Sequence, residues 1–86
     1  MSRLLRLHNT DDVAIALQPI NANERIEFEG FSFTTLEDID KGHKIALKPI
    51  AKGERVIKYG APIGFALEDI NPGAWVHTHC IKTTLH

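Results

Sequence analysis

The chain has little of several features that would define a class. It contains a single cysteine in 86 residues, so no internal disulfide can form and a reducing, cytoplasmic compartment is the simplest expectation. Acidic and basic residues alternate without a basic stripe, and the formal net charge is −1, which argues against nucleic acid as a partner. No apolar run has the length of a signal peptide or a membrane span, so we expect no membrane partner.

A sustained helical period is also missing. No window repeats its apolar residues every 3.6 positions over the length of a helix. Short segments rich in β-branched and aromatic residues are present instead, and Glu29-Gly30 has the composition of a tight hairpin turn. The sequence therefore predicts one all-β domain over residues 1–86, with little helix and with strands within RLLRLH, ERIEFE, FSF, HKIALK, RVIKY and AWVHTHCI.

The chain is internally duplicated. IALQPINANERI, which begins at Ile15, returns as IALKPIAKGERV from Ile45, and LEDIDKG from Leu36 returns as LEDINPG from Leu67. All four segments share the pattern Leu-x-x-Ile-x-x-(Gly or Asn). Because stacked solenoids need three or more repeats, we predict a compact pseudo-symmetric domain with repeats at about 13–42 and 43–73.

The repeated pattern predicts a tight turn. Leu and Ile three positions apart suit a turn that places both side chains in a core. The last position of the pattern, three residues after Ile, needs a positive φ, where glycine has no steric cost and asparagine is the usual substitute. This position is occupied by Asn23, Gly42, Gly53 and Gly73. The Glu-Asp pairs at 37–38 and 68–69 lie inside the turn, which favours solvated or turn-capping roles over acid–base catalysis.

VHTHC, residues 76–80, is the candidate metal motif. In one strand, Trp75, His77 and His79 would share a face, and two imidazoles on one face can ligate the same ion. Cys80 would point to the other face. His43 could approach from another strand, with His8 or His86 as further candidates. The alternative is that His77 and His79 are ordinary strand residues with hydrogen-bond partners.

KYGAPIGFA, residues 58–66, is the second unusual segment. Gly60 and Gly64 flank Pro62, and the sequence predicts a loop whose backbone can approach a ligand or another chain. It lacks the glycine spacing and the Gly-Lys-Ser/Thr ending of a phosphate-binding loop. The alternative is a shaped connection between the two halves.

Taken together, these motifs resemble a known family. The run from GHK at 42–44 through IAKG at 50–53 and KYG-x-PIG at 58–64 to VH-x-H at 76–79 is similar to the N-terminal domain of altronate and galactarate dehydratases. It is similar also to the small subunit of sulfolactate sulfo-lyase. The resemblance implies a small SAF-type domain with a β-clip fold, which agrees with the all-β prediction.

The resemblance also implies a function. Such enzymes catalyse β-elimination on sugar acids or related hydroxy acids, with most of the catalytic machinery on a much larger domain or subunit. It implies a divalent metal in the complex, iron or manganese, with none firmly bound by this chain alone. His77 and His79 would be catalytic residues or metal ligands shared with the partner, and His43 and Lys44 would contact the substrate carboxylate. The loop containing Gly60, Pro62 and Gly64 would dock on the large subunit.

Two interpretations follow. In the first, the chain is the small subunit or the N-terminal domain of a metal-dependent dehydratase or sulfo-lyase, inactive alone and completing the active site of a large catalytic partner. In the second, it is a non-catalytic SAF-type carbohydrate-binding or assembly module, which would not need the VH-x-H ending. Exposed strand edges would allow self-association in either case. Cys80 stands where the family usually has asparagine, so a contact from that amide would be absent.

Overall fold

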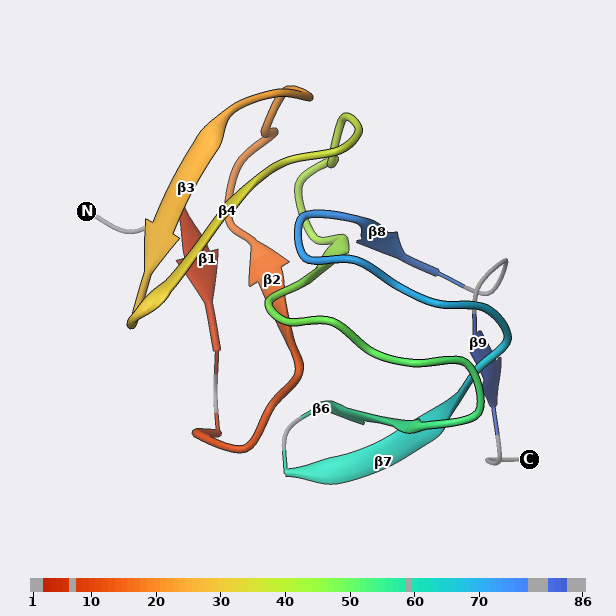
Figure 1. The fold of residues 1–86 in the computed structure, drawn as a ribbon. Helices are drawn as coiled ribbons and strands as arrows, with labels where there is room; N and C mark the ends of the chain where they lie inside the picture. Colours follow the sequence, from red (N-terminus) through yellow and green to blue (C-terminus); the bar gives the residue numbers. More distant parts are fainter. Residues whose placement is uncertain (1–2, 7, 59, 78–80, 84–86) are drawn as a thin grey trace.

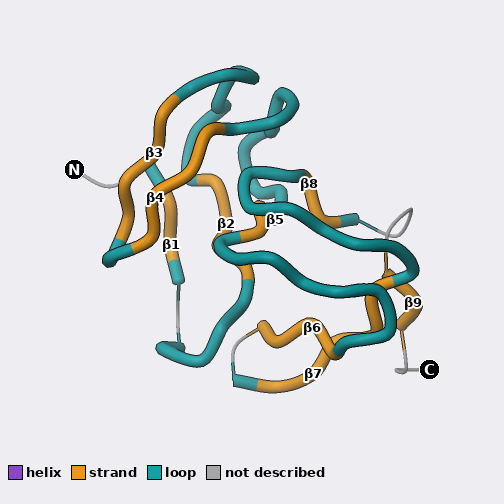
Figure 2. Tube along the Cα trace, viewed as in Figure 1, coloured by secondary structure: helices purple, strands orange, loops and turns teal. Residues whose placement is uncertain are grey.

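The computed structural model describes residues 3–6, 8–58, 60–77 and 81–83. Within these residues there is no helix, and therefore no helix long and apolar enough to cross a membrane (Figure 2). The all-β prediction is confirmed. The described strands are β1 (Leu4–Leu5), β2 (Val13–Ala16), β3 (Arg25–Phe28), β4 (Phe31–Thr34), β5 (Lys44–Ala46), β6 (Arg55–Lys58), β7 (Ala61–Ala66), β8 (Trp75–Val76) and β9 (Ile81–Thr83).

The strands form three antiparallel sheets (Figure 1). The central sheet has the order β1-β2-β5-β8, and so brings together strands from both halves of the chain. The β3–β4 hairpin stands on one side of it, and a smaller sheet of order β6-β7-β9 stands on the other (Figure 1). The hairpin turn is at Glu29 and Gly30, both with positive φ, as its sequence predicts.

The central sheet is buried on both faces. Along β2, Ala14 packs into a first apolar cluster and Val13 into a second, because successive side chains of a strand point to opposite faces. The first cluster is covered by Ile26 and Phe33 of the β3–β4 hairpin. The second is covered by side chains of the smaller sheet, namely Val56, Ala66 and Ile81. This explains why β2 and β5 lack an alternating apolar and polar pattern.

The turn predicted at four places is present at all four. Asn23 has φ of 64°, and the glycines that match it have values of 85°, 87° and 89°. Ile20 and Ile39 exchange two backbone hydrogen bonds of 2.8 Å, and Ile50 and Ile70 do the same. The duplicated sequence is thus accompanied by duplicated backbone pairing, while the limits of the repeats remain a prediction.

The equivalent aspartates of the two repeats make equivalent hydrogen bonds. Asp38 Oδ1 accepts a hydrogen bond from the Ala22 N–H, and Asp69 Oδ1 accepts one from the Lys52 N–H, both at 2.9 Å. These contacts confirm a turn-capping role. Glu24 accepts from the Arg3 guanidinium at 2.6 Å. That hydrogen bond, together with one from a backbone N–H, holds the pKa of Glu24 below its usual value.

The leucines of the pattern do not behave as predicted. All four isoleucines are buried, but only Leu47 among the leucines is buried with them. Leu17, Leu36 and Leu67 are 45%, 54% and 47% exposed. The turn is so short that only its isoleucine faces a core, while its leucine points outward. Leu47 is the exception, because it directly follows the buried end of β5.

Two further sequence predictions are wrong. AWVHTHCI is not one strand, since β8 ends at Val76 and β9 begins at Ile81, with the Ile81 N–H donating to the His77 carbonyl at 3.2 Å. The segment predicted as a loop around Pro62 and Gly64 is strand β7, preceded by a turn at Gly60. A register shift between Val56 and Ile57 of β6 accommodates the proline opposite.

Two buried carboxylates connect the β6–β7 hairpin to the central sheet. Asp12 Oδ2 accepts a hydrogen bond from the Ile57 N–H at 2.9 Å, and its other oxygen lies 2.8 Å from Lys48 Nζ. Asp11 Oδ1 accepts from the Gly60 N–H at 2.7 Å. Buried carboxylates need such partners, because an unpaired buried charge is costly. The turn at Gly60 is therefore bound within its own chain.

The glycine turns give a stability prediction. We expect Gly53→Asn to cost less than about 1 kcal/mol, because Asn23 adopts positive φ in the matching turn and a side chain at position 53 meets no atom within 4 Å. We expect Gly73→Asn to cost about 3 kcal/mol or more, because its Cβ would lie 2.4 Å from the Thr34 carbonyl oxygen. Urea unfolding of both variants measures the difference. Equal losses would contradict the assignment of a packing role to Gly73.

Candidate functional site

Three aromatic rings meet at the end of the central sheet. The rings of Trp75 and His77 have centroids 4.7 Å apart with 14° between their planes. The His43 ring lies 5.3 Å from Trp75 and 6.3 Å from His77, again nearly parallel to both. Trp75 and His43 are half-buried, while His77 is exposed. We call these three residues the ring cluster.

The register of β5 against β8 produces the ring cluster. Lys44 pairs with Val76 and Ile45 pairs with Trp75, so continuing the register places His43 opposite His77. Trp75 shares a face with Ile45, which is buried in the first apolar cluster. The sequence offered His43 as a candidate to approach His77 from another strand, and the structure places the two rings 6.3 Å apart.

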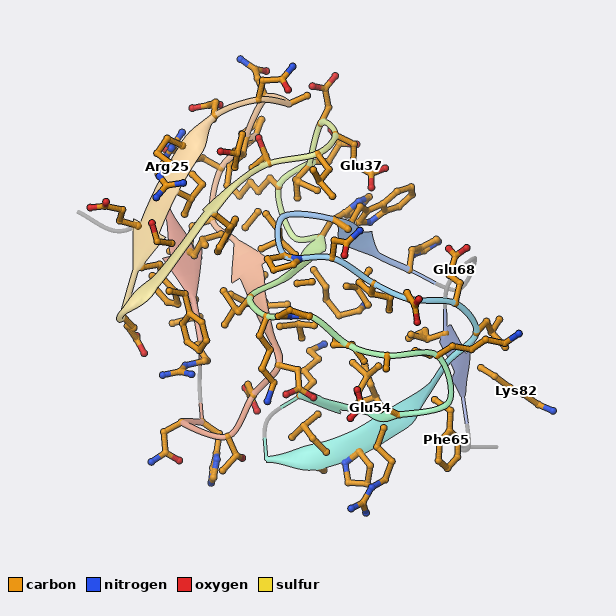
Figure 3. The ribbon with its side chains drawn as sticks, viewed as in Figure 1. Arg25, Glu37, Glu54, Phe65, Glu68 and Lys82 are labelled. Atoms are coloured by element: carbon orange, nitrogen blue, oxygen red, sulfur yellow. The ribbon has the colours of Figure 1, made fainter. Side chains whose placement is uncertain are left out.

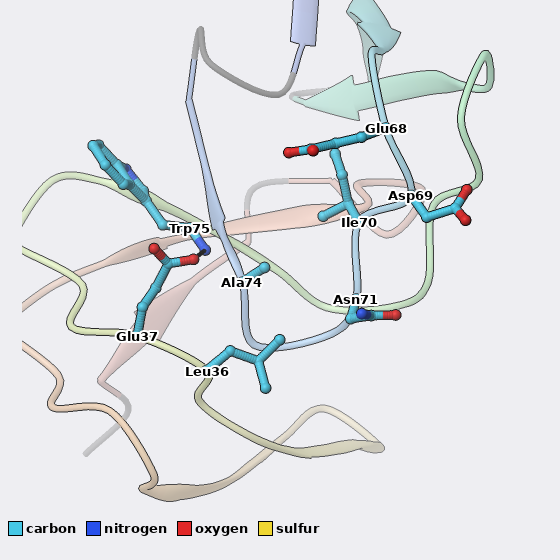
Figure 4. Close-up of a pocket in the computed structure, with 8 residues that line it drawn as sticks. All are labelled: Leu36, Glu37, Glu68, Asp69, Ile70, Asn71, Ala74 and Trp75. Atoms are coloured by element: carbon cyan, nitrogen blue, oxygen red, sulfur yellow. Dashed lines mark hydrogen bonds between the residues drawn. The ribbon is translucent and has the colours of Figure 1, made fainter.

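A carboxylate supports the ring cluster from outside the sheet. The backbone N–H of Trp75 donates to Glu37 Oε2 at 3.0 Å (Figure 4). Glu37 comes from the turn after β4, in the first copy of the repeated Leu-Glu-Asp sequence. The sequence assigned Glu37 only a solvated or turn-capping role. No local pattern connects positions 37 and 75, so this contact was missed.

The other predicted site residues are distributed elsewhere. Lys44 pairs with Val76, which is buried in the second cluster, so Lys44 and the ring cluster are on opposite faces of the sheet. His8 is distant from the ring cluster in the fold: its Nδ1 lies 2.7 Å from Thr10 Oγ1, and its ring lies beside Gly60. His79, Cys80 and His86 lie outside the described residues.

The described residues alone do not form a metal site. Among residues 3–6, 8–58, 60–77 and 81–83, no three His, Cys, Asp or Glu side chains are close enough together to ligate one ion. His43 and His77 supply at most two ligands, whereas a typical protein site has three or four.

Comparison with known proteins shows the family. The chain matches the family described as "Altronate/galactarate dehydratase SAF domain" over residues 2–84. The chain belongs to the altronate/galactarate dehydratase SAF-domain family.

Individual relatives carry lyase names. The chain is 41% identical to the altronate dehydratase of Bacillus subtilis over 85 residues, 99% of this chain and 17% of that enzyme. It is 43% identical to the Escherichia coli altronate dehydratase over 81 residues, 94% of this chain and 16% of that enzyme. It is also 47% identical to (2R)-sulfolactate sulfo-lyase subunit alpha of Paracoccus pantotrophus over 53 residues, 62% of this chain and 79% of that subunit.

The coverage differs between the two kinds of relative. The chain spans about one sixth of the altronate dehydratases, but it matches most of a protein that is named as one subunit of a sulfo-lyase. A second subunit alpha, from Chromohalobacter salexigens, is 29% identical and is covered over 90% of its length. The chain is therefore related to lyases as a domain or a subunit.

The geometry of the ring cluster gives a spectroscopic prediction. Trp75 is the single tryptophan, so its emission reports on this site alone. We expect His77→Ala to shift the emission maximum to longer wavelength, because the indole loses a ring 4.7 Å away and gains water contact. His8→Ala is the matched control and should leave the spectrum unchanged. Identical spectra for both variants would contradict the stacking of His77 on Trp75.

Proposed function

We propose that this chain is the accessory subunit or domain of a lyase and completes the active site of a larger catalytic chain. The reaction would be dehydration of a sugar acid such as altronate or galactarate, or removal of sulfite from a sulfo-hydroxy acid. The observation that carries the proposal is the meeting of His43 and His77 at 6.3 Å beside Trp75 in a chain of this family. Two imidazoles form part of a site, and the remaining groups would come from the larger chain.

The proposed chemistry is β-elimination. A proton leaves the carbon next to the carboxylate, and hydroxide or sulfite leaves the adjacent carbon. Imidazole suits either proton transfer, since one ring nitrogen accepts a hydrogen bond while the other donates. In this proposal His77, together with His79, contacts the reacting part of the substrate, and His43 binds its carboxylate. Lys44 would reach that carboxylate only around the edge strand β8, from the opposite face.

The metal belongs to the proposed complex. A divalent ion, iron or manganese, would supply Lewis-acid activation of the substrate carboxylate and hydroxyl when bound. His77 and His79 would be its contacts on this chain, and the larger chain would supply the other ligands.

A binding module is the second candidate. The half-buried Trp75 and the two nearly parallel imidazoles beside it offer aromatic surface on which the C–H groups of a sugar could pack. This chain would then bind a carbohydrate without taking part in a reaction. In the accessory-subunit proposal, the segment that contains Gly60, Pro62 and Gly64 is the docking element for the larger chain, although Pro62 and Gly64 lie in strand β7.

Catalytic activity of the assembled complex tests the proposal. The chain is used as bait in its native cell extract, and the large chain recovered in equal amount is assayed with altronate, galactarate and sulfolactate. We expect His77→Ala and His79→Ala each to lower kcat about 100-fold or more, with unchanged circular dichroism, and His8→Ala to leave kcat unchanged. Full activity in the His77/His79 double variant would remove the site assignment. Recovery of no large chain would favour the binding module.

Metal binding by the isolated chain is a separate prediction. We expect calorimetry with iron(II) or manganese(II) to show only weak, non-stoichiometric heats, because this chain supplies an incomplete ligand set. Addition of the large chain should convert them into stoichiometric binding. Tight binding of one ion by the isolated chain would contradict a site shared between chains.

A further inference from the structure

A groove beside the ring cluster is lined by residues to which the proposed reaction assigns no role. It is a cavity of about 110 Å³ lined by Leu36, Glu37, Glu68, Asp69, Ile70, Asn71, Ala74 and Trp75. Small-molecule sites are typically about 300–1,000 Å³, so the groove suits one inserted side chain better than a separate ligand. We call it the acidic groove.

The two copies of the repeated Leu-Glu-Asp sequence meet at the acidic groove. Glu37 belongs to the first copy and Glu68 to the second. Figure 3 shows both glutamates in the upper right of the view, with Phe65 near the lower edge. In Figure 4 the Glu68 side chain extends toward the side where Glu37 and Trp75 lie, while Asp69 and Asn71 point the other way.

The charge of the groove is of one sign. Of the described residues that line it, Glu37, Glu68 and Asp69 are acidic and none is basic, although the Asp69 carboxylate points away and accepts a hydrogen bond from the Lys52 N–H. Glu37 is oriented by its hydrogen bond with the Trp75 N–H. Glu68 makes no hydrogen bond or ion pair with any residue that the structure describes. Its exposed carboxylate is therefore available to a partner.

The lining favours an organic cation over a metal ion. No group of three ligating side chains exists among the described residues, whereas a guanidinium or ammonium group needs only one or two carboxylates and binds well over an indole ring. Leu36, 54% exposed at the rim, and the apolar atoms of Ile70 and Ala74 would contact the aliphatic part of such a side chain.

We propose that the acidic groove binds a Lys or Arg side chain, flanked by an aliphatic residue, from the larger catalytic chain. This inference rests on the proposed function. Charge complementarity supports it, and so does the position of the groove, which adjoins the ring cluster through Trp75 and Glu37. A partner bound there would lie next to the site that the larger chain is proposed to complete.

Affinity for the purified large chain tests the inference. We expect Glu68→Lys to raise Kd about 10-fold or more and to reduce its dependence on salt, because it places a cation opposite the incoming cation. We expect Leu36→Ser to raise Kd about fivefold through loss of apolar contact. The matched controls are Glu27→Lys on β3 and Leu17→Ser, whose leucine is similarly exposed at the equivalent turn position. Both should stay within about twofold of wild type.

A photo-crosslinking residue in place of Leu36 tests the chemistry of the occupant. We expect crosslinks to a peptide of the large chain that contains Lys or Arg beside an aliphatic residue. Wild-type binding with unchanged Kd for Glu68→Lys and Leu36→Ser would overturn the groove assignment and leave the accessory role intact. Crosslinks to a second copy of this chain, with a dimer that Glu68→Lys dissociates, would also overturn it. If the wild-type chain does not bind the large chain at all, the accessory role itself is refuted.

Discussion

The structure depends on two backbone bridges between isoleucines. Ile20 pairs with Ile39 and Ile50 pairs with Ile70. Each isoleucine is buried, and the residue three positions after it has positive φ. These bridges close turns that would otherwise leave polar backbone groups unpaired in an apolar environment. Because they occur twice, the chain can bury both faces of one central sheet under short strands. A domain of 86 residues without a disulfide buries a smaller fraction of its surface than a large domain does, so it needs both faces of the sheet covered to form a core.

The candidate site follows from this arrangement. The second and fourth of the repeated turns lead into β5 and β8, which pair at the edge of the central sheet. Their register brings His43, Trp75 and His77 together, although the histidines are far apart in sequence. One face of the site is thus built on paired strands, while Glu37 from another turn contacts the backbone of Trp75.

Several features were readable from the sequence because they depend on neighbouring residues. Positive φ at Gly42, Gly53 and Gly73, its substitution by Asn23, and the hairpin at Glu29-Gly30 all follow from local sterics. The errors have equally specific causes. Leu36 and Leu67 are exposed because the turn buries only its isoleucine. The segment from Ala61 became strand β7 because β6 and β9 supplied partners on both sides, which no local pattern records.

The sequence by itself determined the strand-rich class, the duplication, the turn positions and the family, since each is encoded in short-range pattern or in similarity along the chain. The tertiary structure decided which residues meet. The burial of Asp11 and Asp12, the contact of Glu37 with Trp75, the separation of Lys44 from His43 by the sheet and the acidic groove all depend on strand register. Register is a choice between long-range pairings, and it is set by the burial of whole faces.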